Sequence, residues 1–213
     1  MQTEAKRCRV KICGITSIID AQMVANAGVD AIGLVFYAKS KRNVSIEQAA
    51  AICQALPPFI STVGLFLDAD RAFVQQVLAQ VPLDLLQFHG LETPAYCQQF
   101  QRPYIKAVGI HGLESVGGFQ AYAEQYTHAK GFLLDSHALG GAGGTGETFD
   151  WSLVPQHYTK PIILAGGLTP HNVAQAIQQS GVYAVDLSSG VEAAPGVKDS
   201  AKVQAFMQAV ASA

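Results

Sequence analysis

Short apolar runs recur along the whole 213-residue chain, and they constrain its fold more than any other feature. Eight such runs begin roughly 20 to 30 residues apart, the length of one strand with its crossover helix. The runs cover residues 10–15, 31–36, 62–67, 85–88, 105–110, 132–135, 162–165 and 184–187. Eight strand-helix units predict a single α/β domain over residues 1–213, closed into a (βα)8 TIM barrel. An open, doubly wound parallel sheet is the alternative that this spacing leaves open.

Residues that typically begin or end helices lie between these runs. A side-chain acceptor can bond the free amides of a first helical turn, and glycine adopts the left-handed conformation that ends a helix. The expected boundaries are Thr16 or Ser17 with Gly28, Ser45 with Gln48, Thr93-Pro94, and Thr169-Pro170 with Gly181. No linker or composition shift divides the chain, which favours one domain.

Charge and hydropathy exclude several classes of partner. The formal net charge is −2 and the 14 Lys and Arg residues are scattered, so we expect no nucleic-acid partner. No apolar run reaches the roughly 18 residues that a membrane-spanning helix needs, so we expect no membrane role. Residues 1–9 lack the apolar centre of a secretory signal, which predicts a cytoplasmic protein.

The cysteines and histidines predict neither a disulfide nor a metal site. Cys8, Cys13, Cys53 and Cys97 contain no C-x-x-C pair, and cytoplasmic thiols stay reduced. The six histidines lack the spacings that are typical of metal ligands. We therefore expect four free thiols and no bound metal.

Two reactive side chains end predicted strands, at the end of the barrel where TIM-barrel enzymes have their active sites. Asp135 closes the apolar run Phe-Leu-Leu-Asp, where desolvation would raise its pKa and suit it to act as a general acid. Its alternative role is to cap the following loop or to bind a nearby backbone amide. Cys13 lies near the end of the first run, as either a thiolate base or a small buried hydrophobe. Lys11 shares the strand face of Cys13, and could fill the barrel interior or bind a substrate anion.

Glycine-rich segments follow the seventh and eighth runs, where TIM barrels commonly bind phosphate. Backbone amides without bulky side chains can approach an anion closely, so the two segments together predict a phosphorylated substrate. The candidate residues are Gly166, Gly167, Ser188, Ser189 and Gly190. A third glycine cluster, residues 140–146, is either a lid over the site or a plain connector.

A basic loop follows the second run and contains Arg42 between other cations. Arginine offers the forked donor geometry that binds a carboxylate, so Arg42 is a candidate ligand for an acidic substrate group. A solvated basic loop is the alternative. His89 follows the fourth run and is a further pocket candidate.

Taken together, the motifs resemble those of the phosphoribosylanthranilate isomerase family, in its monofunctional form, over nearly the whole chain. The resemblance rests on K-I-C-G-I-T at 11–16, G-L-V-F at 33–36, S-K-R-N-V-S at 40–45, Q-F-H-G at 87–90, L-L-D at 133–135, G-G-T-G at 143–146, F-D-W at 149–151, L-A-G-G-L at 164–168, D-L-S-S-G-V-E at 186–192 and P-G-V-K-D at 195–199.

The resemblance implies a cofactor-free Amadori rearrangement of N-(5-phosphoribosyl)anthranilate in tryptophan biosynthesis. The family pattern assigns Asp135 the role of general acid, which opens the ribose ring, and Cys13 the role of general base at C2′. It assigns Arg42 to the anthranilate carboxylate, and it gives Asp186 and His89 places in the pocket wall. The phosphate would be held by amides around Gly167, Ser189 and Gly190. The expected partner is a small phosphorylated substrate, with a monomer expected and a homodimer possible.

Two departures and two alternatives accompany this resemblance. The family usually has S-P-R where this chain has Ser40-Lys41-Arg42, and Phe88 replaces a usual leucine. The histidine-pathway isomerase performs the same rearrangement with paired aspartates, whereas the first predicted strand here ends in cysteine. A barrel that binds a phosphorylated ligand without catalysis is the other alternative, which the intact Cys13 and Asp135 disfavour.

Overall fold

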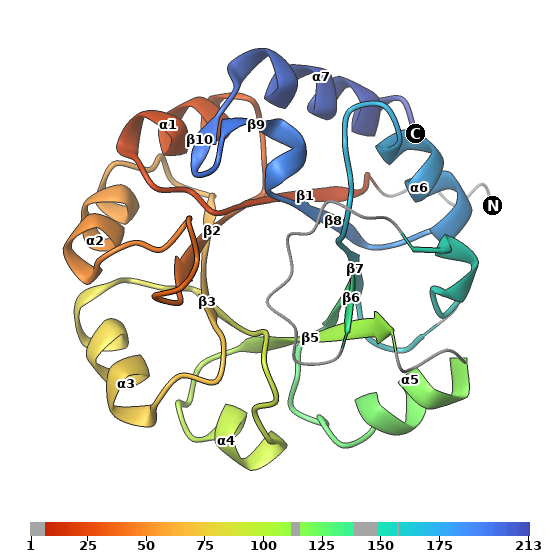
Figure 1. Cartoon of the computed structure of the whole chain (residues 1–213), viewed down its shortest axis with the longest axis horizontal. Helices are drawn as coiled ribbons and strands as arrows, with labels where there is room; N and C mark the ends of the chain where they lie inside the picture. The colour runs from red at the N-terminus through yellow and green to blue at the C-terminus, as the bar shows by residue number, and fades with distance from the viewer. Residues whose placement is uncertain (1–6, 112–115, 139–148, 157) are drawn as a thin grey trace.

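Eight parallel strands form a closed barrel in the order β1 to β8, with helices around the outside (Figure 1). The computed structural model describes residues 7–111, 116–138, 149–156 and 158–213. The strands are β1 (Arg9–Cys13), β2 (Ala31–Phe36), β3 (Ser61–Phe66), β4 (Leu85–Phe88), β5 (Tyr104–His111), β6 (Phe132–Ala138), β7 (Ile162–Leu164) and β8 (Ala184–Leu187). Because β1 pairs with both β2 and β8, the sheet closes on itself, which confirms the barrel and excludes the doubly wound sheet.

Helices follow most of the strands and cover the outside of the barrel (Figure 1). They are α1 (Ile18–Asn26), α2 (Ile46–Gln54), α3 (Arg71–Gln80), α4 (Pro94–Gln98), α5 (Val116–Ala123), α6 (Val173–Ser180) and α7 (Ser200–Ala211). In the described part of the β6–β7 connection, the only helical turn is the 3-10 helix η1 (Trp151–Leu153). After β8 come a second 3-10 turn, η2 (Ser189–Val191), and a hairpin of β9 (Glu192–Ala194) and β10 (Val197–Lys198).

Backbone conformation sets the strand ends where they differ from the predicted runs. β2, β4 and β8 coincide with their predicted runs. β1 ends at Cys13, two residues early, because Gly14 has φ +75° and leaves the extended region. This early end leaves Cys13 as the last strand residue, at the rim of the barrel.

The helix boundaries agree with the capping signals at Ser17 and Ser45 and differ at α6. Ser17 accepts a hydrogen bond from the Asp20 amide, and Ser45 forms a complete capping box with Gln48. The prediction that α6 begins at Thr169-Pro170 is wrong, since α6 begins at Val173. Asn172 bonds the Thr169 amide and the Gly167 carbonyl, which forms a separate turn before the helix.

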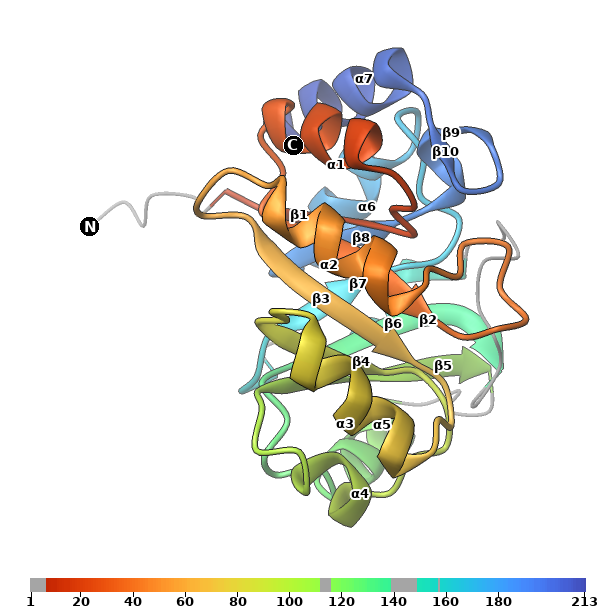
Figure 2. The same cartoon turned by 90° about the vertical axis from the view of Figure 1, so that its left-hand side faces the viewer.

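Two layers of side chains are separated by the barrel wall. A large apolar cluster fills the space between strands and helices and includes Ile12, Leu34 and Phe66. Inside the barrel, Ala107, Leu133 and Ala165 form a small second cluster. All strands run toward the same end of the barrel, the right-hand end in Figure 2. The loops that follow the strands therefore meet there, as a TIM-barrel active site requires.

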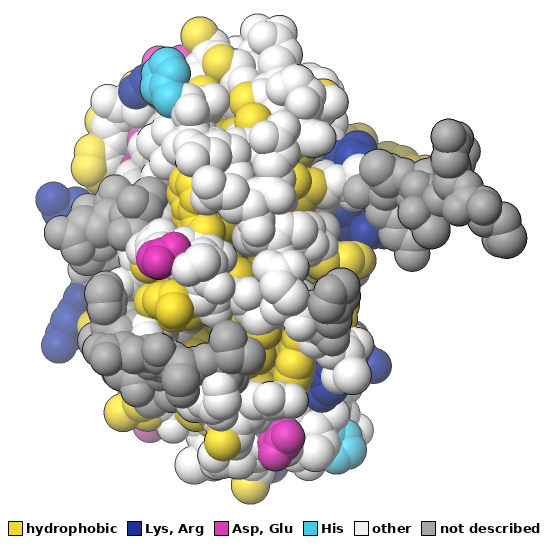
Figure 3. Space-filling model, turned by 90° about the vertical axis from the view of Figure 1, so that its right-hand side faces the viewer, with side chains coloured by type: hydrophobic (Ala, Val, Ile, Leu, Met, Phe, Trp, Pro, Cys, Tyr) yellow, Lys and Arg dark blue, Asp and Glu magenta, His cyan; other side chains and the backbone are white. Residues whose placement is uncertain are grey.

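On the face in Figure 3, Lys and Arg side chains lie in separate places rather than in one continuous patch. Within the described residues, no helix combines the length and the hydropathy that crossing a bilayer demands.

Candidate active site

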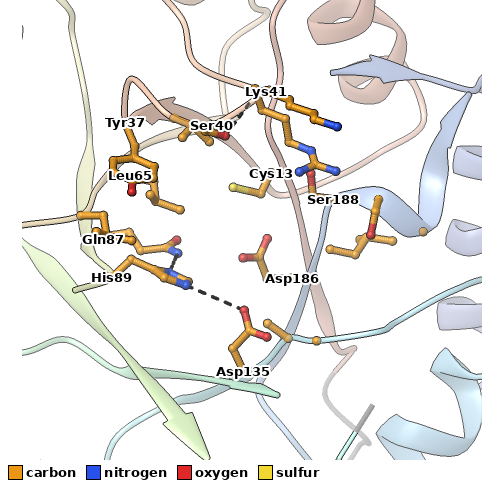
Figure 4. Close-up of a pocket in the computed structure, with 18 of the residues that line it drawn as sticks. Cys13, Tyr37, Ser40, Lys41, Leu65, Gln87, His89, Asp135, Asp186 and Ser188 are labelled. Carbon is orange, nitrogen blue, oxygen red and sulfur yellow. Dashed lines mark hydrogen bonds and ion pairs between the residues drawn. The ribbon is translucent and has the colours of Figure 1, made fainter. Parts of the chain in front are cut away.

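A pocket opens at the carboxyl end of the barrel and brings the predicted site residues together (Figure 4). Its lining includes ten residues that the sequence nominated for the site: Cys13, Arg42, His89, Asp135, Gly166, Gly167, Asp186, Ser188, Ser189 and Gly190. These residues come from β1, β4, β6, β7 and β8 and from their following loops, with Arg42 in the β2–α2 loop. The strands thus converge on one cavity, although the nominated residues lie up to 177 positions apart, between 13 and 190.

Cys13 lies at the end of β1 and is 7% exposed, with its sulfur directed into the pocket (Figure 4). A Cβ atom at Gly33 of the neighbouring strand would lie only 2.6 Å from the sulfur, so a larger residue there would displace the thiol. Burial raises the pKa of the Cys13 thiol, while the ammonium groups of Lys11 and Lys198 lower it. In the empty pocket the raised pKa favours the protonated thiol at neutral pH.

Lys11 lies in the barrel interior and forms an ion pair with Asp186, with 2.8 Å between Nζ and Oδ2. The two residues are partners in the β1–β8 register, which explains the contact. Burial alone would lower the Lys11 pKa, but Asp186 and Cys13 more than offset that effect and raise it. Of the two alternatives for Lys11, the structure thus supports the interior position.

Asp135 lies in β6 and faces His89 across the pocket (Figure 4). Its Oδ1 accepts a hydrogen bond of 2.7 Å from the Ser136 amide, which is the bond to a nearby backbone amide that the sequence allowed as an alternative role. Its Oδ2 lies 3.9 Å from His89 Nε2. The other ring nitrogen of His89 lies 3.0 Å from Gln87 Nε2, and this contact orients the imidazole. One carboxylate oxygen is therefore fixed by the backbone while the other faces the cavity side.

The loop after β7 approaches Asp135 closely because residue 166 is glycine. A Cβ atom at Gly166 would lie 2.7 Å from the Ser136 amide nitrogen and 2.9 Å from Asp135 Oδ1. Gly166 also has φ +87°, in the region that glycine tolerates best. Both observations tie this glycine to the position of the acid.

The β7 and β8 loops meet around backbone amides that are open to the pocket. A Cβ atom at Gly190 would lie 2.0 Å from the Leu168 carbonyl oxygen, so the loops could not meet with any other residue there. Among the described residues, the amides of Gly167 and Gly190 donate to no protein acceptor. Such free amides suit an anion, as the sequence predicted for this edge of the pocket.

Arg42 reaches the pocket from the β2–α2 loop and forms a forked ion pair with Glu192. The two bonds measure 2.8 Å from Nε to Oε1 and 2.7 Å from Nη2 to Oε2. These bonds use two of the five guanidinium N–H groups, so three remain for another acceptor. Burial would raise the Glu192 pKa, but bonds to Arg42 and Lys198 lower it to about 2.

Lys198 was not nominated from the sequence, although it joins three parts of the site. Its ammonium donates to the Cys13 carbonyl at 2.7 Å, to Glu192 Oε1 at 2.9 Å and to the Ser188 carbonyl at 3.2 Å. Burial lowers the pKa of Lys198 while Glu192 raises it. The three residues that accept these bonds lie at the ends of β1 and β8 and in β9, so one side chain holds these segments together.

Sequence reasoning assigned no role to Glu192, Lys198 or Gln87. Glu192 and Lys198 lie within the quoted motifs, but motif membership does not identify their contacts with Arg42 and Cys13. Gln87 carried a weak signal, because it is a polar residue inside an apolar strand. It is 1% exposed, and such burial of an amide usually marks a specific hydrogen bond.

Residues 140–146 lie outside the described residues, so neither alternative for that segment is tested here. Cys8, Cys13, Cys53 and Cys97 are free thiols. No group of three or more His, Cys, Asp or Glu side chains within the described parts of the chain could hold a metal ion.

Comparison with known proteins identifies the family. The family model described as N-(5'phosphoribosyl)anthranilate (PRA) isomerase matches residues 10–209. The N-(5'-phosphoribosyl)anthranilate isomerase of Pseudomonas putida GB-1 is 57% identical over 96% of this chain and 98% of its own length. That of Cellvibrio japonicus is 55% identical over 95% of this chain and 93% of its own.

Solved structures agree with the sequence relatives. Phosphoribosyl anthranilate isomerase from Thermotoga maritima has a TM-score of 0.86 and 38% identity, covering 97% of this chain and all of its own. The Thermus thermophilus enzyme has a TM-score of 0.85 and 35% identity, covering 96% and 98%. A further solved phosphoribosyl anthranilate isomerase (TM-score 0.83, 37% identity, 97% and 100% coverage) is in complex with reduced 1-(o-carboxyphenylamino)-1-deoxyribulose 5-phosphate. The chain therefore belongs to the N-(5'-phosphoribosyl)anthranilate isomerase family and is an isomerase.

Proposed function

We propose that this isomerase converts N-(5'-phosphoribosyl)anthranilate to 1-(2-carboxyphenylamino)-1-deoxyribulose 5-phosphate, with Asp135 as general acid and Cys13 as general base. The reaction is the Amadori rearrangement of tryptophan biosynthesis. The observation that carries the assignment is that a buried carboxyl group and a buried thiol line one pocket beside two glycine-rich loops. The substrate is inferred from family membership, and the acid and base roles are proposed for side chains that line the pocket.

Asp135 begins the reaction by donating a proton to the furanose ring oxygen. The bond between that oxygen and C1′ then breaks, and the nitrogen lone pair forms a C1′=N double bond. The product is an open chain with a new hydroxyl group and a positively charged Schiff base. Asp135 suits this step because the Ser136 amide fixes one carboxyl oxygen and leaves the other on the cavity side.

Cys13 then removes the proton from C2′ of the Schiff base. The C–H electrons form a C1′=C2′ bond, the C=N electrons return to nitrogen, and a neutral enolamine results. The enolamine tautomerises to the ketone when its C2′ hydroxyl loses a proton and C1′ gains one. Only the thiolate acts as a base, so the proton must leave Cys13 first, and the nearby Lys11 and Lys198 charges assist because they lower the thiol pKa.

The two charged ends of the substrate have separate candidate donors in the pocket. The phosphate fits the β7 and β8 loops, where the Gly166–Gly167 and Ser188–Gly190 segments present backbone amides. The anthranilate carboxylate fits Arg42, whose remaining N–H groups are available beside the Glu192 pair. His89 and Asp186 also line this pocket.

The two alternative functions predict different results. A histidine-pathway isomerase would rearrange that pathway's aminoimidazole substrate, and a non-catalytic barrel would bind a phosphorylated ligand without turnover. Family membership favours neither, and the cysteine at the β1 end disfavours the paired-aspartate chemistry.

The direct test is consumption of phosphoribosylanthranilate by the purified chain, followed as loss of anthranilate-type fluorescence without added metal or nucleotide. Turnover is expected, and it should fall at least about 100-fold in Cys13→Ser and in Asp135→Asn, the typical cost of losing a proton-transfer group. Arg42→Ala should act mainly on KM. Near-native turnover in a folded Cys13→Ser or Asp135→Asn variant would remove that residue from its role, and dependence on a metal ion would overturn the cofactor-free reaction.

We also propose that residues 1–213 form one domain that acts as a monomer in the cytoplasm. The single closed barrel supports the domain boundary. A homodimer is the alternative, because one solved structure concerns monomers generated from the dimeric Thermotoga maritima isomerase. Light scattering on the purified protein distinguishes a mass near 22.5 kDa from twice that value.

A further inference from the structure

Asp186 has a carboxylate oxygen that the fold leaves without a partner. The residue is 6% exposed, and its Oδ2 accepts from Lys11 at 2.8 Å. Its Oδ1 is buried and has no hydrogen-bond partner among the described residues. A buried carboxylate oxygen without a partner costs free energy, so proteins rarely retain one unless a ligand completes it.

The free oxygen belongs to a carboxylate that lies between the two proposed catalytic groups. Figure 4 shows Asp186 directed into the pocket, with Cys13 on one side and Asp135 on the other. Burial is the main cause that raises the pKa of both Cys13 and Asp186, and neighbouring carboxylates add to it: Asp186 raises the Cys13 pKa and Asp135 raises the Asp186 pKa. Asp186 is therefore close to both ends of the acid-base pair.

The order of atoms in the substrate fixes what such a group would face. The ring oxygen that Asp135 protonates is bonded to C1′, and C1′ is bonded to C2′, from which Cys13 takes a proton. The atom between the two proton-transfer sites is thus C1′, which carries the nitrogen. Ring opening makes this C1′=N unit positively charged, and a fixed negative charge in a dry site stabilises such a cation.

We infer that Asp186 is a third catalytic residue, whose carboxylate stabilises the positively charged Schiff base by facing C1′ and accepting a hydrogen bond from its N–H. This role rests on the proposed function and adds a group that acts between the acid and base steps. Lys11 holds the carboxylate in position through the oxygen that does not face the substrate. No proton moves to Asp186 in this role.

Asp186→Asn tests this role, because asparagine keeps the shape of the side chain and removes its charge. Turnover of phosphoribosylanthranilate should fall about 100-fold, the typical cost of losing one preorganised electrostatic contact, while KM changes by less than about threefold. Asp70→Asn is the matched control, since Asp70 is an exposed aspartate whose side chain makes no capping bond. It should retain native kcat and KM.

Binding of an uncharged analogue separates charge stabilisation from simple binding. The probe is reduced 1-(o-carboxyphenylamino)-1-deoxyribulose 5-phosphate, whose secondary amine carries no Schiff-base charge. Its affinity for Asp186→Asn should stay within about threefold of native, because only the charged intermediate loses stabilisation. An affinity that falls in parallel with kcat/KM, or a native kcat in Asp186→Asn, would overturn the inference.

The double variant Lys11→Met/Asp186→Leu covers the case in which Asp186→Asn fails to fold. It removes both buried charges at once, which proteins often tolerate better than the loss of one partner. Its kcat should be at least as low as expected for Asp186→Asn, and a native kcat would overturn the inference. If the native chain itself does not turn over phosphoribosylanthranilate, the proposed function fails. Native turnover with an unaffected Asp186→Asn variant rejects only the role of Asp186.

Discussion

Two buried lysine–carboxylate pairs of the described residues, Lys106–Glu92 and Lys11–Asp186, differ in how completely their polar atoms are bonded. Lys106 donates to Glu92 at 3.2 Å and to the carbonyl oxygens of Phe88, Gly90 and Ala107. Glu92 in turn accepts bonds of 2.9 Å from two backbone amides. The Lys11–Asp186 pair, by contrast, retains a carboxylate oxygen without a described partner.

The difference separates a structural ion pair from a functional one. The Lys106–Glu92 pair satisfies its polar atoms within the protein and fastens the loop after β4. In the Lys11–Asp186 pair only one carboxylate oxygen is bonded, and the other is presented to the pocket. Burial and pairing alone do not distinguish the two, whereas the count of satisfied oxygens does.

The largest expected effect comes from Lys106→Met. This change leaves Glu92 and three carbonyl oxygens without their buried donor, so the free energy of unfolding should fall by about 3–5 kcal/mol. Lys11→Met should cost less, because it removes the donor of one carboxylate oxygen, whereas Lys106→Met also removes the donor of three backbone carbonyl oxygens. Urea denaturation of both variants checks the order.

Turnover should show the opposite order in these two variants. The kcat of folded Lys106→Met should stay close to native, while that of Lys11→Met should fall. The distinction between a structural and a functional ion pair would be wrong if Lys106→Met lost turnover and Lys11→Met lost more free energy of unfolding than Lys106→Met.

A second prediction concerns the space around Cys13. A Cβ atom at Gly33 would lie 2.6 Å from the sulfur, so Gly33→Ala should shift the thiol and lower kcat about 100-fold, the cost of a misplacement near 1 Å. Gly64→Ala is the matched control, because its Cβ atom would meet Leu83 at 2.5 Å. Both variants should lose stability, but only Gly33→Ala should lose most of its turnover at saturating substrate.

A third prediction concerns the charge of Lys11. Its ammonium lowers the Cys13 pKa against the larger effect of burial, so Lys11→Met should raise that pKa further. The thiol should then ionise at higher pH, measured as thiolate absorbance with Cys13→Ser as the blank. Turnover at neutral pH should fall about tenfold, consistent with the loss of one nearby opposite charge. An unchanged thiol titration would show that Lys11 serves only the barrel interior.

The smallest expected effect concerns Glu192, the carboxylate shared by Arg42 and Lys198. Its pKa is lowered from 4.5 to about 2, so its pairs stabilise the fold above pH 4.5 and lose that contribution as the pH falls toward 2. The free energy of unfolding of native protein should decline more steeply over this range than that of Glu192→Gln. If the free energies of unfolding of both proteins declined in parallel, the Glu192 pKa would be the same in the folded and the unfolded chain.

The barrel and the location of its site could be predicted because both depend on local patterns. Strands buried on both faces produce continuous apolar runs, and their spacing reports the crossover helices. Cys13 and Asp135 could be nominated because parallel strands of a barrel bring their carboxyl ends together. No knowledge of pairwise contacts was needed for either inference.

The remaining features depend on contacts that the sequence does not encode locally. Arg42 and Glu192 lie 150 positions apart, and nothing in either segment identifies the other as its partner. The start of α6 was missed because the Asn172 side chain bonds the Thr169 amide and competes with the helix. The incomplete bonding of Asp186 likewise appears only when all its neighbours are known.

The bonds of Lys198 bear on how the enzyme matures during synthesis. Its ammonium holds the Cys13 carbonyl across 185 positions of sequence, and β1 also awaits β8 to close the sheet. β1 thus reaches its final surroundings only after β8 and Lys198 have been synthesised. Chains that stop before these residues would leave the edge of β1 exposed, and catalytic competence would appear only once they are in place.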